Sequence, residues 1–228
     1  MHALPSNPLG CAAAGSTRLL ELFSGAGSVG EAFRRRGWEV HSLDIAQLPG
    51  AEPLTFQCDV RDWQPQGHYD VVWASPPCTQ HSRARTTAKA PRDLEGADQL
   101  VATARGIIDQ LRPRYWFMEN PQTGVSKGRK VVAGLPFRDI SYCAYSVPYR
   151  KDTRIWSNAA ADPAWVTRMC PGPGQRWAME GWRHRSRAQS RPSRDSQDHW
   201  RREDLYRIPA PLCDSIADFC TAALAEDL

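Results

Sequence analysis

The 228-residue chain lacks long apolar runs and any regular cysteine pattern. No stretch reaches the roughly 18 apolar residues that a helix needs to cross a bilayer. The seven cysteines are odd in number and scattered, and none belongs to a C-x-x-C pair. These absences argue against a membrane span, a disulfide framework and a four-cysteine zinc site. We therefore expect no metal, no membrane and a reducing intracellular compartment, either a nucleus or a bacterial or virus-infected cytoplasm.

Residues 1–16 lack the basic stretch and long apolar stretch of a secretory signal, and we expect them to form a mobile leader. Hydrophobic residues make up 41% of the chain, which is enough for a folded core and argues against a disordered protein. No feature indicates an obligate protein partner.

The net charge is small, +4, but positive charge is concentrated late in the chain. Residues 168–202 contain nine arginines and three acidic residues, so this segment carries +6 and the rest of the chain carries −2. Solvated charged segments are usually mixed in sign. A segment with this imbalance is typical of proteins that bind a polyanion such as DNA.

Short apolar runs alternate with segments of helical spacing. This alternation predicts an α/β domain with a mostly parallel sheet. The predicted strands are 17–23, 39–45, 54–60, 68–77, 115–120, 139–147 and 153–158, and the predicted helices are 28–38, 94–111 and 205–224.

A glycine-rich turn joins the first strand to the first helix. In FSGAGSVG (23–30), Gly25, Gly27 and Gly30 form G-x-G-x-x-G, which lets the backbone approach a nucleotide closely. This pattern alone also fits NAD. Asp44 follows the next strand and could bind ribose hydroxyls. Asp59 could accept an adenine amine or merely cap a turn.

A second loop follows the fourth strand, in ASPPCTQHS (74–82). The two prolines stiffen this loop and present Cys78 at the carboxyl edge of the sheet, where α/β proteins bind ligands. His81 and Ser82 lie close in sequence, and a basic neighbour would favour the thiolate. The alternative is a buried structural cysteine.

Glu119 ends the apolar strand in FMENP (117–121). A carboxyl group in this position is expected to be half-buried and suited to bonding a ring nitrogen. The alternative is that Glu119 caps the next loop.

Together these motifs resemble the DNA cytosine-5 methyltransferases. The family order is a Phe-Gly cofactor loop, an acidic ribose residue, a Pro-Cys nucleophile loop, a Glu-Asn strand end and an arginine-containing strand. Here that order is followed by FSGAG, Asp44, PPC, Glu119-Asn120 and YRKDTRIW (149–156). The resemblance covers residues 17–158 well and the final helix loosely, and the short recognition region is like that of compact phage, viral or algal members.

The resemblance implies a Rossmann-like class I S-adenosylmethionine-dependent methyltransferase sheet with a small, irregular basic target-recognition segment. It also implies the cofactor S-adenosyl-L-methionine and a cytosine-containing DNA substrate, whose base is flipped and attacked by Cys78. The expected domains are the leader, a catalytic domain at 17–158, a recognition region at 159–203 and a docking C-terminal helix at 204–228.

The resemblance assigns a role to each site residue. The expected catalytic residues are Cys78, Glu119 and Arg154; the cofactor residues are Phe23, Ser24, Gly25, Gly27, Asp44, Asp59, Val60 and Pro76; the DNA-binding residues are Ser82, Arg183, Arg185 and Arg187.

The chain departs from the family pattern at several positions. Thr79 replaces a glutamine, Pro121 a valine and Asp152 an arginine, and IPAP (208–211) stands where a Gly-Asn-Ser motif is usual. A catalytically dead DNA-binding relative is therefore one alternative. An NAD-dependent oxidoreductase is another, although it has no evident need for the Pro-Pro-Cys and Glu-Asn motifs.

Overall fold

The computed structural model describes residues 16–82, 91–170 and 205–226, and the backbone of three two-residue strands between the last two ranges. Its centre is a seven-stranded sheet with the order β3-β2-β1-β4-β5-β8-β6. These strands are β1 (Arg18–Leu22), β2 (Glu39–Asp44), β3 (Phe56–Gln57), β4 (Val71–Ala74), β5 (Tyr115–Pro121), β6 (Phe137–Ser141) and β8 (Asp152–Ser157). The short strands are β7 (Tyr149–Arg150), β9 (Met179–Glu180), β10 (Arg183–His184) and β11 (Ser186–Arg187).

The first five strands of the sheet are parallel, and β8 runs antiparallel between β5 and β6. Parallel strands are covered on both faces, which explains their nearly continuous apolar sequences. The order of strands reverses between β1 and β4, and ligands bind at such a switch point in open α/β sheets. The predicted Rossmann-like α/β fold is confirmed.

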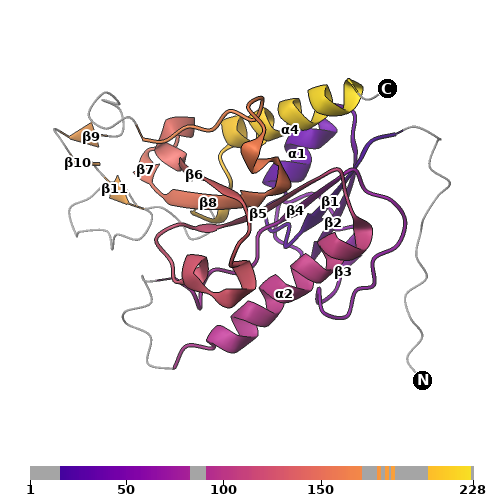
Figure 1. The fold of residues 1–228 in the computed structure, drawn as a ribbon, viewed down its shortest axis with the longest axis horizontal. Helices are drawn as coiled ribbons and strands as arrows, with labels where there is room; N and C mark the ends of the chain where they lie inside the picture. The colour runs from indigo at the N-terminus through magenta and orange to yellow at the C-terminus, as the bar shows by residue number, and fades with distance from the viewer. Residues whose placement is uncertain are drawn as a thin grey trace.

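Helices cover both faces of the sheet (Figure 1). Helices α1 (Ser28–Arg34) and α4 (Ala210–Ala225) lie on one face, and α2 (Leu94–Leu111) crosses the other. The sheet has an apolar core on each face. Neighbouring residues of β1 pack into different cores, because side chains alternate between the two faces along a strand. Leu19 packs in the core under α1 and α4, whereas Leu20 packs in the core under α2.

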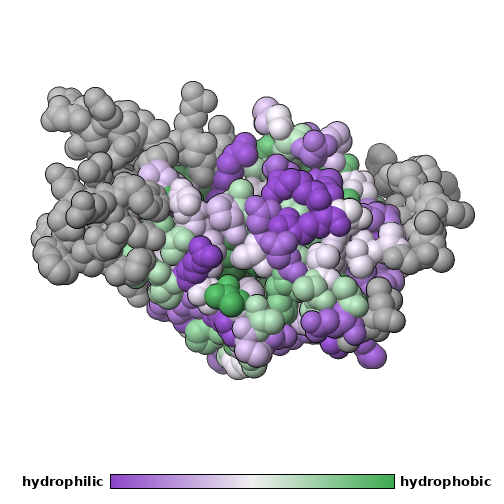
Figure 2. Space-filling model, turned by 90° about the horizontal axis from the view of Figure 1, so that it is seen from above, coloured by the Kyte–Doolittle hydropathy of each residue, from purple (hydrophilic) through white to green (hydrophobic). Residues whose placement is uncertain are grey.

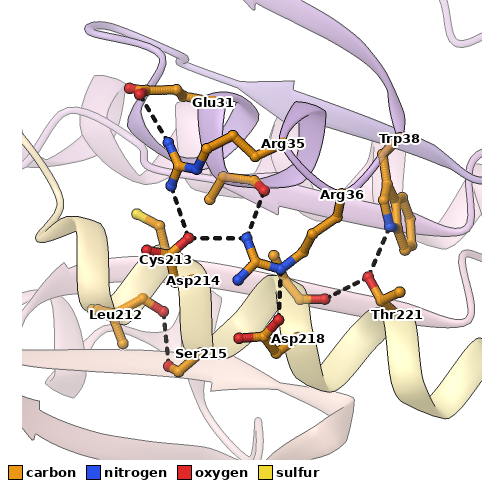
Figure 3. Close-up of polar contacts among 12 residues, drawn as sticks. Glu31, Arg35, Arg36, Trp38, Leu212, Cys213, Asp214, Ser215, Asp218 and Thr221 are labelled. Carbon is orange, nitrogen blue, oxygen red and sulfur yellow. Dashed lines mark hydrogen bonds and ion pairs between the residues drawn. The ribbon is translucent and has the colours of Figure 1, made fainter.

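Polar contacts fasten α4 to α1 at the rim of their apolar contact (Figure 3). Asp214 accepts from Arg35 at 2.7 Å and from Arg36 at 2.9 Å, and Arg36 also reaches Asp218 at 2.7 Å. The Trp38 indole N–H donates to Thr221 Oγ1 at 2.9 Å. These partly exposed ion pairs add little stability each. They fix the orientation of a helix that is held mainly by buried apolar residues such as Ile216 and Phe219.

Seen from the side of α1 and α4, the described surface carries mostly hydrophilic side chains with small apolar patches (Figure 2). Among the described residues, no helix has the length and apolar content required to cross a bilayer.

Several predicted elements differ from the structure in their bounds: the strand predicted at 68–77 is limited to Val71–Ala74, and the helices predicted at 28–38 and 205–224 are Ser28–Arg34 and Ala210–Ala225. The strand expected at 139–147 ends at Ser141, and residues 142–145 form a 3-10 turn that stops at Ser146, which has a left-handed φ of 64°. The strand expected at 54–60 shrinks to Phe56–Gln57. In both segments some apolar residues, such as Val60 and Tyr142, are buried outside the strand.

Residues 159–170 were expected to begin an irregular recognition region; they are irregular after Ala161, and Ala159 and Trp165 are buried in the core. Asn158–Ala161 forms a short 3-10 helix, and Trp165 is fully buried against Phe117, with ring centroids 5.2 Å apart. The predicted leader, except Ser16, lies outside the described residues, as do all side chains at 171–204.

Candidate active site

A cavity of about 500 Å³ opens at the carboxyl ends of β1, β2, β4 and β5, at the switch point of the sheet. Its size is typical of a cofactor or small-molecule site. The cavity brings together nine residues predicted for catalysis or cofactor binding, namely Phe23, Ser24, Gly25, Asp44, Asp59, Val60, Pro76, Cys78 and Glu119. Gly27 does not line it.

The glycine loop turns sharply between β1 and α1. Gly25 and Gly27 have left-handed φ values of 51° and 70°, which favour glycine, and Gly27 is the N-cap of α1. Gly30 serves packing instead, because an added Cβ would lie 2.6 Å from Glu21 Oε2 and 2.9 Å from Val40 Cγ1. The first two glycines therefore shape the loop, and the third lets the helix approach the sheet.

Asp44 ties the end of β2 to the glycine loop. Its Oδ2 accepts from the Gly25 N–H at 2.9 Å, and its Oδ1 accepts from the Ala46 N–H at 3.3 Å. Beside it, Ile45 is 67% exposed although it is apolar, and it lines the cavity. A carboxylate beside an exposed apolar side chain suits a ligand with both hydroxyl groups and a flat apolar ring.

Asp59 lies on the same wall and is bound by Arg61. The guanidinium donates to Oδ2 at 2.5 Å and the Arg61 backbone N–H donates to Oδ1 at 2.9 Å. These bonds lower the pKa of Asp59 to about 2, so the carboxylate is charged at neutral pH. The adjacent Val60 is buried and supplies an apolar wall.

Cys78 lies in the loop after β4 and faces the cavity. Burial raises the pKa of its thiol, and the negative charge of Glu119 raises it further, whereas Lys151 lowers it. The resting group is therefore a thiol at neutral pH, and the cation that favours its ionisation is Lys151.

Glu119 lies near the end of β5 and is 7% exposed. The Tyr142 hydroxyl donates to its Oε1 at 3.4 Å, and the Lys151 ammonium lies 3.9 Å from the same oxygen. The neighbouring Asn120 amide donates to the Pro76 carbonyl at 2.9 Å. This bond connects the Glu119 strand directly to the loop that holds Cys78.

Lys151 is a site residue that the sequence did not reveal. It lies between β7 and β8 and lines the cavity. Its ammonium lies 4.4 Å from the centre of the Tyr142 ring and donates to the Leu205 carbonyl at 3.3 Å. The signal was present in YRKDTRIW, where Lys151 comes three residues before the arginine that was chosen.

Arg154 was expected in the active site, but the structure places it elsewhere. It lies in β8 opposite Asp139 of β6, and two bonds of 2.7 and 2.9 Å join the two side chains. Its guanidinium also stacks 3.4 Å from the centre of the Phe137 ring. Arg154 therefore fastens the edge strand and does not line the cavity.

His81 was expected to be a basic neighbour of Cys78, but it points away from the cavity. It is 1% exposed, and its Nε2 lies 3.1 Å from Asp98 Oδ1 in α2. Ser82, predicted to contact DNA, also does not line the cavity.

Arg183, Arg185 and Arg187 have side chains outside the described residues. The backbone of β11 pairs in parallel with β7, with Arg187 opposite Arg150. Within the basic segment, the backbone of Ser186–Arg187 therefore runs beside the strand that leads to Lys151.

Two further cavity residues come from the segment before α4. Tyr206 is 55% exposed and Ile208 is partly buried, and both line the cavity. Sequence reasoning noted IPAP (208–211) only as a missing motif, so it overlooked the contribution of this segment. Within the described residues, no group of three or more His, Cys, Asp or Glu side chains could hold a metal ion.

Glu21 is a fully buried acid at the back of the cavity. It accepts from the Gly30 N–H at 3.0 Å and the Val29 N–H at 3.3 Å. Burial outweighs these bonds and raises the pKa of Glu21 to about 7. Folding therefore favours the protonated acid at mildly acidic pH.

This shift predicts a pH-dependent stability. The folded pKa is about 7 against 4.5 for the free group, so the stabilisation is fully present below about pH 4.5 and is lost as pH rises through about 7. Urea unfolding should show a decrease of up to about 3 kcal/mol over this range. Glu21→Gln should flatten that decrease, whereas Glu31→Gln, at a side chain 66% exposed, should retain it. An equal slope in all three proteins would contradict the assignment.

No family model matches the chain. Over 227 residues it is 33% identical to the "Probable DNA (cytosine-5)-methyltransferase" of Frog virus 3 (isolate Goorha), and the match covers 89% of this chain and 100% of that protein. It is also 25% identical over 175 residues to the "Type II methyltransferase M.AgeI" of Thalassovita gelatinovora, covering 64% of this chain and 40% of that protein.

Solved structures with similar folds include a putative DNA modification methyltransferase encoded within an E. coli prophage. Its TM-score is 0.45 at 19% identity, with 62% of this chain and 46% of that chain covered. The Entamoeba histolytica methyltransferase EhMeth has a TM-score of 0.43 at 14% identity, with 70% of this chain and 55% of that chain covered. The chain thus spans about half the length of these structures and all of its viral relative.

Proposed function

Because the chain belongs to the DNA (cytosine-5)-methyltransferase family, we propose that it methylates carbon 5 of a flipped cytosine in DNA through a covalent bond to Cys78. The observation that carries this proposal is the meeting of Cys78, Glu119 and Lys151 in the cavity that also holds the glycine loop. A nucleophile, a hydrogen-bonding carboxyl group and a cation then surround one substrate-sized space.

The cavity residues fit S-adenosyl-L-methionine, which supplies an activated methyl group when bound. The backbone of Phe23, Ser24 and Gly25 forms the turn beside the cavity, and Asp44 provides the carboxylate for ribose hydroxyls. Ile45 and Val60 supply apolar surface for the adenine ring, and Asp59 is an acceptor for its amine. The resemblance that implied this cofactor is supported by this donor set.

The proposed reaction requires a sulfur nucleophile because cytosine carbon 5 is too unreactive on its own. The Cys78 thiolate adds to carbon 6, and carbon 5 becomes nucleophilic and takes the methyl group. A solvent base then takes the carbon 5 proton, the double bond between carbons 5 and 6 forms again, and the carbon 6–sulfur bond breaks to release the Cys78 thiolate. Lys151 favours the thiolate, since it is the cation that lowers the pKa of Cys78.

Glu119 is proposed to hold the base by its ring nitrogen 3 during this addition. Tyr142 and Lys151 both approach Oε1 of Glu119. They would fix the carboxyl group and leave Oε2 for the substrate. The bond from Asn120 to Pro76 would keep this group at a constant distance from Cys78.

DNA binding is proposed for the basic segment at 168–202, including Arg183, Arg185 and Arg187, because its charge suits phosphates. The cytosine must leave the duplex stack to reach Cys78, so base flipping is part of the proposal. Arg187 belongs to β11, which pairs with β7 just before Lys151, so bound phosphates would lie near the site.

Methyl transfer to DNA tests the proposed function. The full chain is incubated with cofactor carrying a radioactive methyl group and with cytosine-rich DNA or RNA, and the products are digested to nucleosides. We expect 5-methyldeoxycytidine from DNA. No transfer, together with cofactor binding, would indicate the catalytically dead relative, and methylation of RNA alone would overturn the substrate assignment.

Replacing Lys151 separates its role from that of Arg154. Lys151→Met removes the cation near Cys78, so methyl transfer at neutral pH should fall roughly tenfold or more. The deficit should shrink as pH rises, because hydroxide then generates the thiolate. Lys151→Arg should keep the charge and much of the rate.

The matched control is Arg154→Met, which removes a cation that contacts only the edge strand among the described contacts. It should lower thermal stability and leave the pH profile of the rate unchanged. The assignment is wrong if Arg154→Met moves the pH profile and Lys151→Met does not.

A further inference from the structure

A second, small cavity is lined by residues from the nucleophile loop and from the strand that holds Glu119. It is lined by His81 of the loop, Asn120 of β5 and Ser126 of the first 3-10 turn, with apolar walls from Met118, Val132 and Trp156. The volume of this cavity is about 10 Å³. That is close to the minimum that one water molecule requires.

Three buried polar atoms from these residues have no hydrogen-bond partner within the described part of the chain: His81 Nδ1, Asn120 Oδ1 and Ser126 Oγ. Leaving a buried polar atom unpaired costs about 1–3 kcal/mol. The three atoms belong to residues that line one cavity, so a single polar ligand shared by them would satisfy all three, and the volume admits only a very small one.

The donor and acceptor state of each atom is fixed by its neighbours. His81 Nε2 lies 3.1 Å from the Asp98 carboxylate, which accepts from it, so Nδ1 is an acceptor in the tautomer that carries its hydrogen on Nε2. The Asn120 amide nitrogen donates to the Pro76 carbonyl, so Oδ1 is also an acceptor. Ser126 can donate through its hydroxyl hydrogen.

Two acceptors and one donor suit a water molecule, which can donate two hydrogen bonds and accept others. We propose that one water molecule is bound here, that it donates to His81 Nδ1 and Asn120 Oδ1 and accepts from Ser126, and that it bridges the Cys78 loop to the Glu119 strand. It makes three hydrogen bonds, the usual number for a buried water. The significance of the bridge for catalysis rests on the proposed function.

The surrounding backbone holds the three residues in position. The Val125 N–H donates to the His81 carbonyl at 2.9 Å, which places Ser126 beside the histidine. Gly124 permits this approach, because an added Cβ would lie 3.1 Å from the same carbonyl. Arg129 binds the second oxygen of Asp98 at 2.8 Å and so fixes the carboxylate that orients His81.

The bridge gives His81 and Ser126 a positioning role at a distance from the reacting atoms. Asn120 uses one end of its amide to hold Pro76 and would use the other to hold the water. Movement of the water-bound residues would therefore change the separation of Cys78 and Glu119. The glycine loop, Asp44 and Asp59 lie outside this network.

A high-resolution crystal structure of the full chain tests the site directly. We expect an electron-density peak within about 2.7–3.2 Å of His81 Nδ1, Asn120 Oδ1 and Ser126 Oγ. The same ring and amide orientations with no peak between them would overturn the proposal. A peak in a protein that fails to methylate DNA would leave the water site intact and overturn only the proposed function.

A matched pair of variants tests the positioning role. Ser126→Thr and Ser126→Val add the same bulk, but only threonine keeps the hydroxyl. We expect Ser126→Val to lose the density peak and to form the covalent adduct with 5-fluorocytosine DNA at least about fivefold more slowly. Ser126→Thr should retain both the peak and the rate, and the affinity for S-adenosylhomocysteine should be unchanged in both variants.

Two outcomes would refute the positioning role. Equal losses in both variants would mean that crowding, and not the missing hydroxyl, slows the reaction. A wild-type adduct rate in Ser126→Val, with the peak gone, would mean that the water has no bearing on Cys78.

Discussion

Cys78→Ser should reduce methyl transfer by at least about three orders of magnitude, because a serine hydroxyl is far less acidic than a thiol. Burial and Glu119 already raise the pKa of the Cys78 thiol. The less acidic serine would be still harder to ionise in the same surroundings. The rate of methyl incorporation into DNA measures the effect.

The control for Cys78→Ser is cofactor binding. Calorimetry with S-adenosylhomocysteine should give an affinity close to that of the wild type, because the glycine loop and Asp44 keep their contacts. The 5-fluorocytosine DNA adduct should be absent. Turnover near the wild-type rate would exclude the covalent mechanism, and loss of cofactor binding would mean that the variant has lost its fold around the cavity.

Glu119→Gln should lower the maximal rate by roughly 10²–10⁴-fold, the usual contribution of a positioned acid or base. Glutamine matches the shape of the buried glutamate and can still accept from Tyr142. It cannot exchange a proton with the ring nitrogen of the base. Single-turnover methylation measures the chemical step directly.

Glu119→Asp provides the matched comparison, since it keeps the acid but withdraws it by one methylene. It should retain more activity than Glu119→Gln if proton exchange is the main role. If both variants lose the rate equally while DNA binding is unchanged, the position of the group matters more than its acidity. A wild-type rate in Glu119→Gln would remove Glu119 from the mechanism.

Local sequence patterns predicted the sheet because its central strands are apolar on both faces. The helix at 94–111 was predicted with the bounds that the structure gives. Its apolar residues follow one face, and the Asp93 side chain accepts from the Gly96 N–H at 2.8 Å, which marks its start. The run at 139–147 was misjudged because Tyr142 and Tyr145 suit a strand equally well. Only tertiary packing buries them in a 3-10 turn.

Tertiary packing also explains why the sequence pointed to Arg154, whereas the structure places Lys151 in the lining of the cavity. Arg154 was matched to the arginine of the family motif because two apolar residues, Ile155 and Trp156, follow it. The position of the Arg154 side chain depends on its partner on the neighbouring strand. That partner is Asp139, which lies 15 residues earlier in the sequence. Cys78 and Glu119 were easier to find because each follows an apolar strand, and parallel strands end at one edge.

The fastening of α4 to α1 has a consequence for how the protein is made. Arg36 and Asp218 are 182 positions apart, so this contact cannot form until the ribosome has produced nearly all of the sequence shown. Until then Val29 and Phe33 have no cover from Ile216 and Phe219. Contacts of such long sequence separation slow folding and leave apolar surface open to aggregation during synthesis. Polypeptides released before Ala210 should therefore accumulate as chaperone-bound or insoluble material, even though they carry every residue of the glycine loop, Cys78 and Glu119.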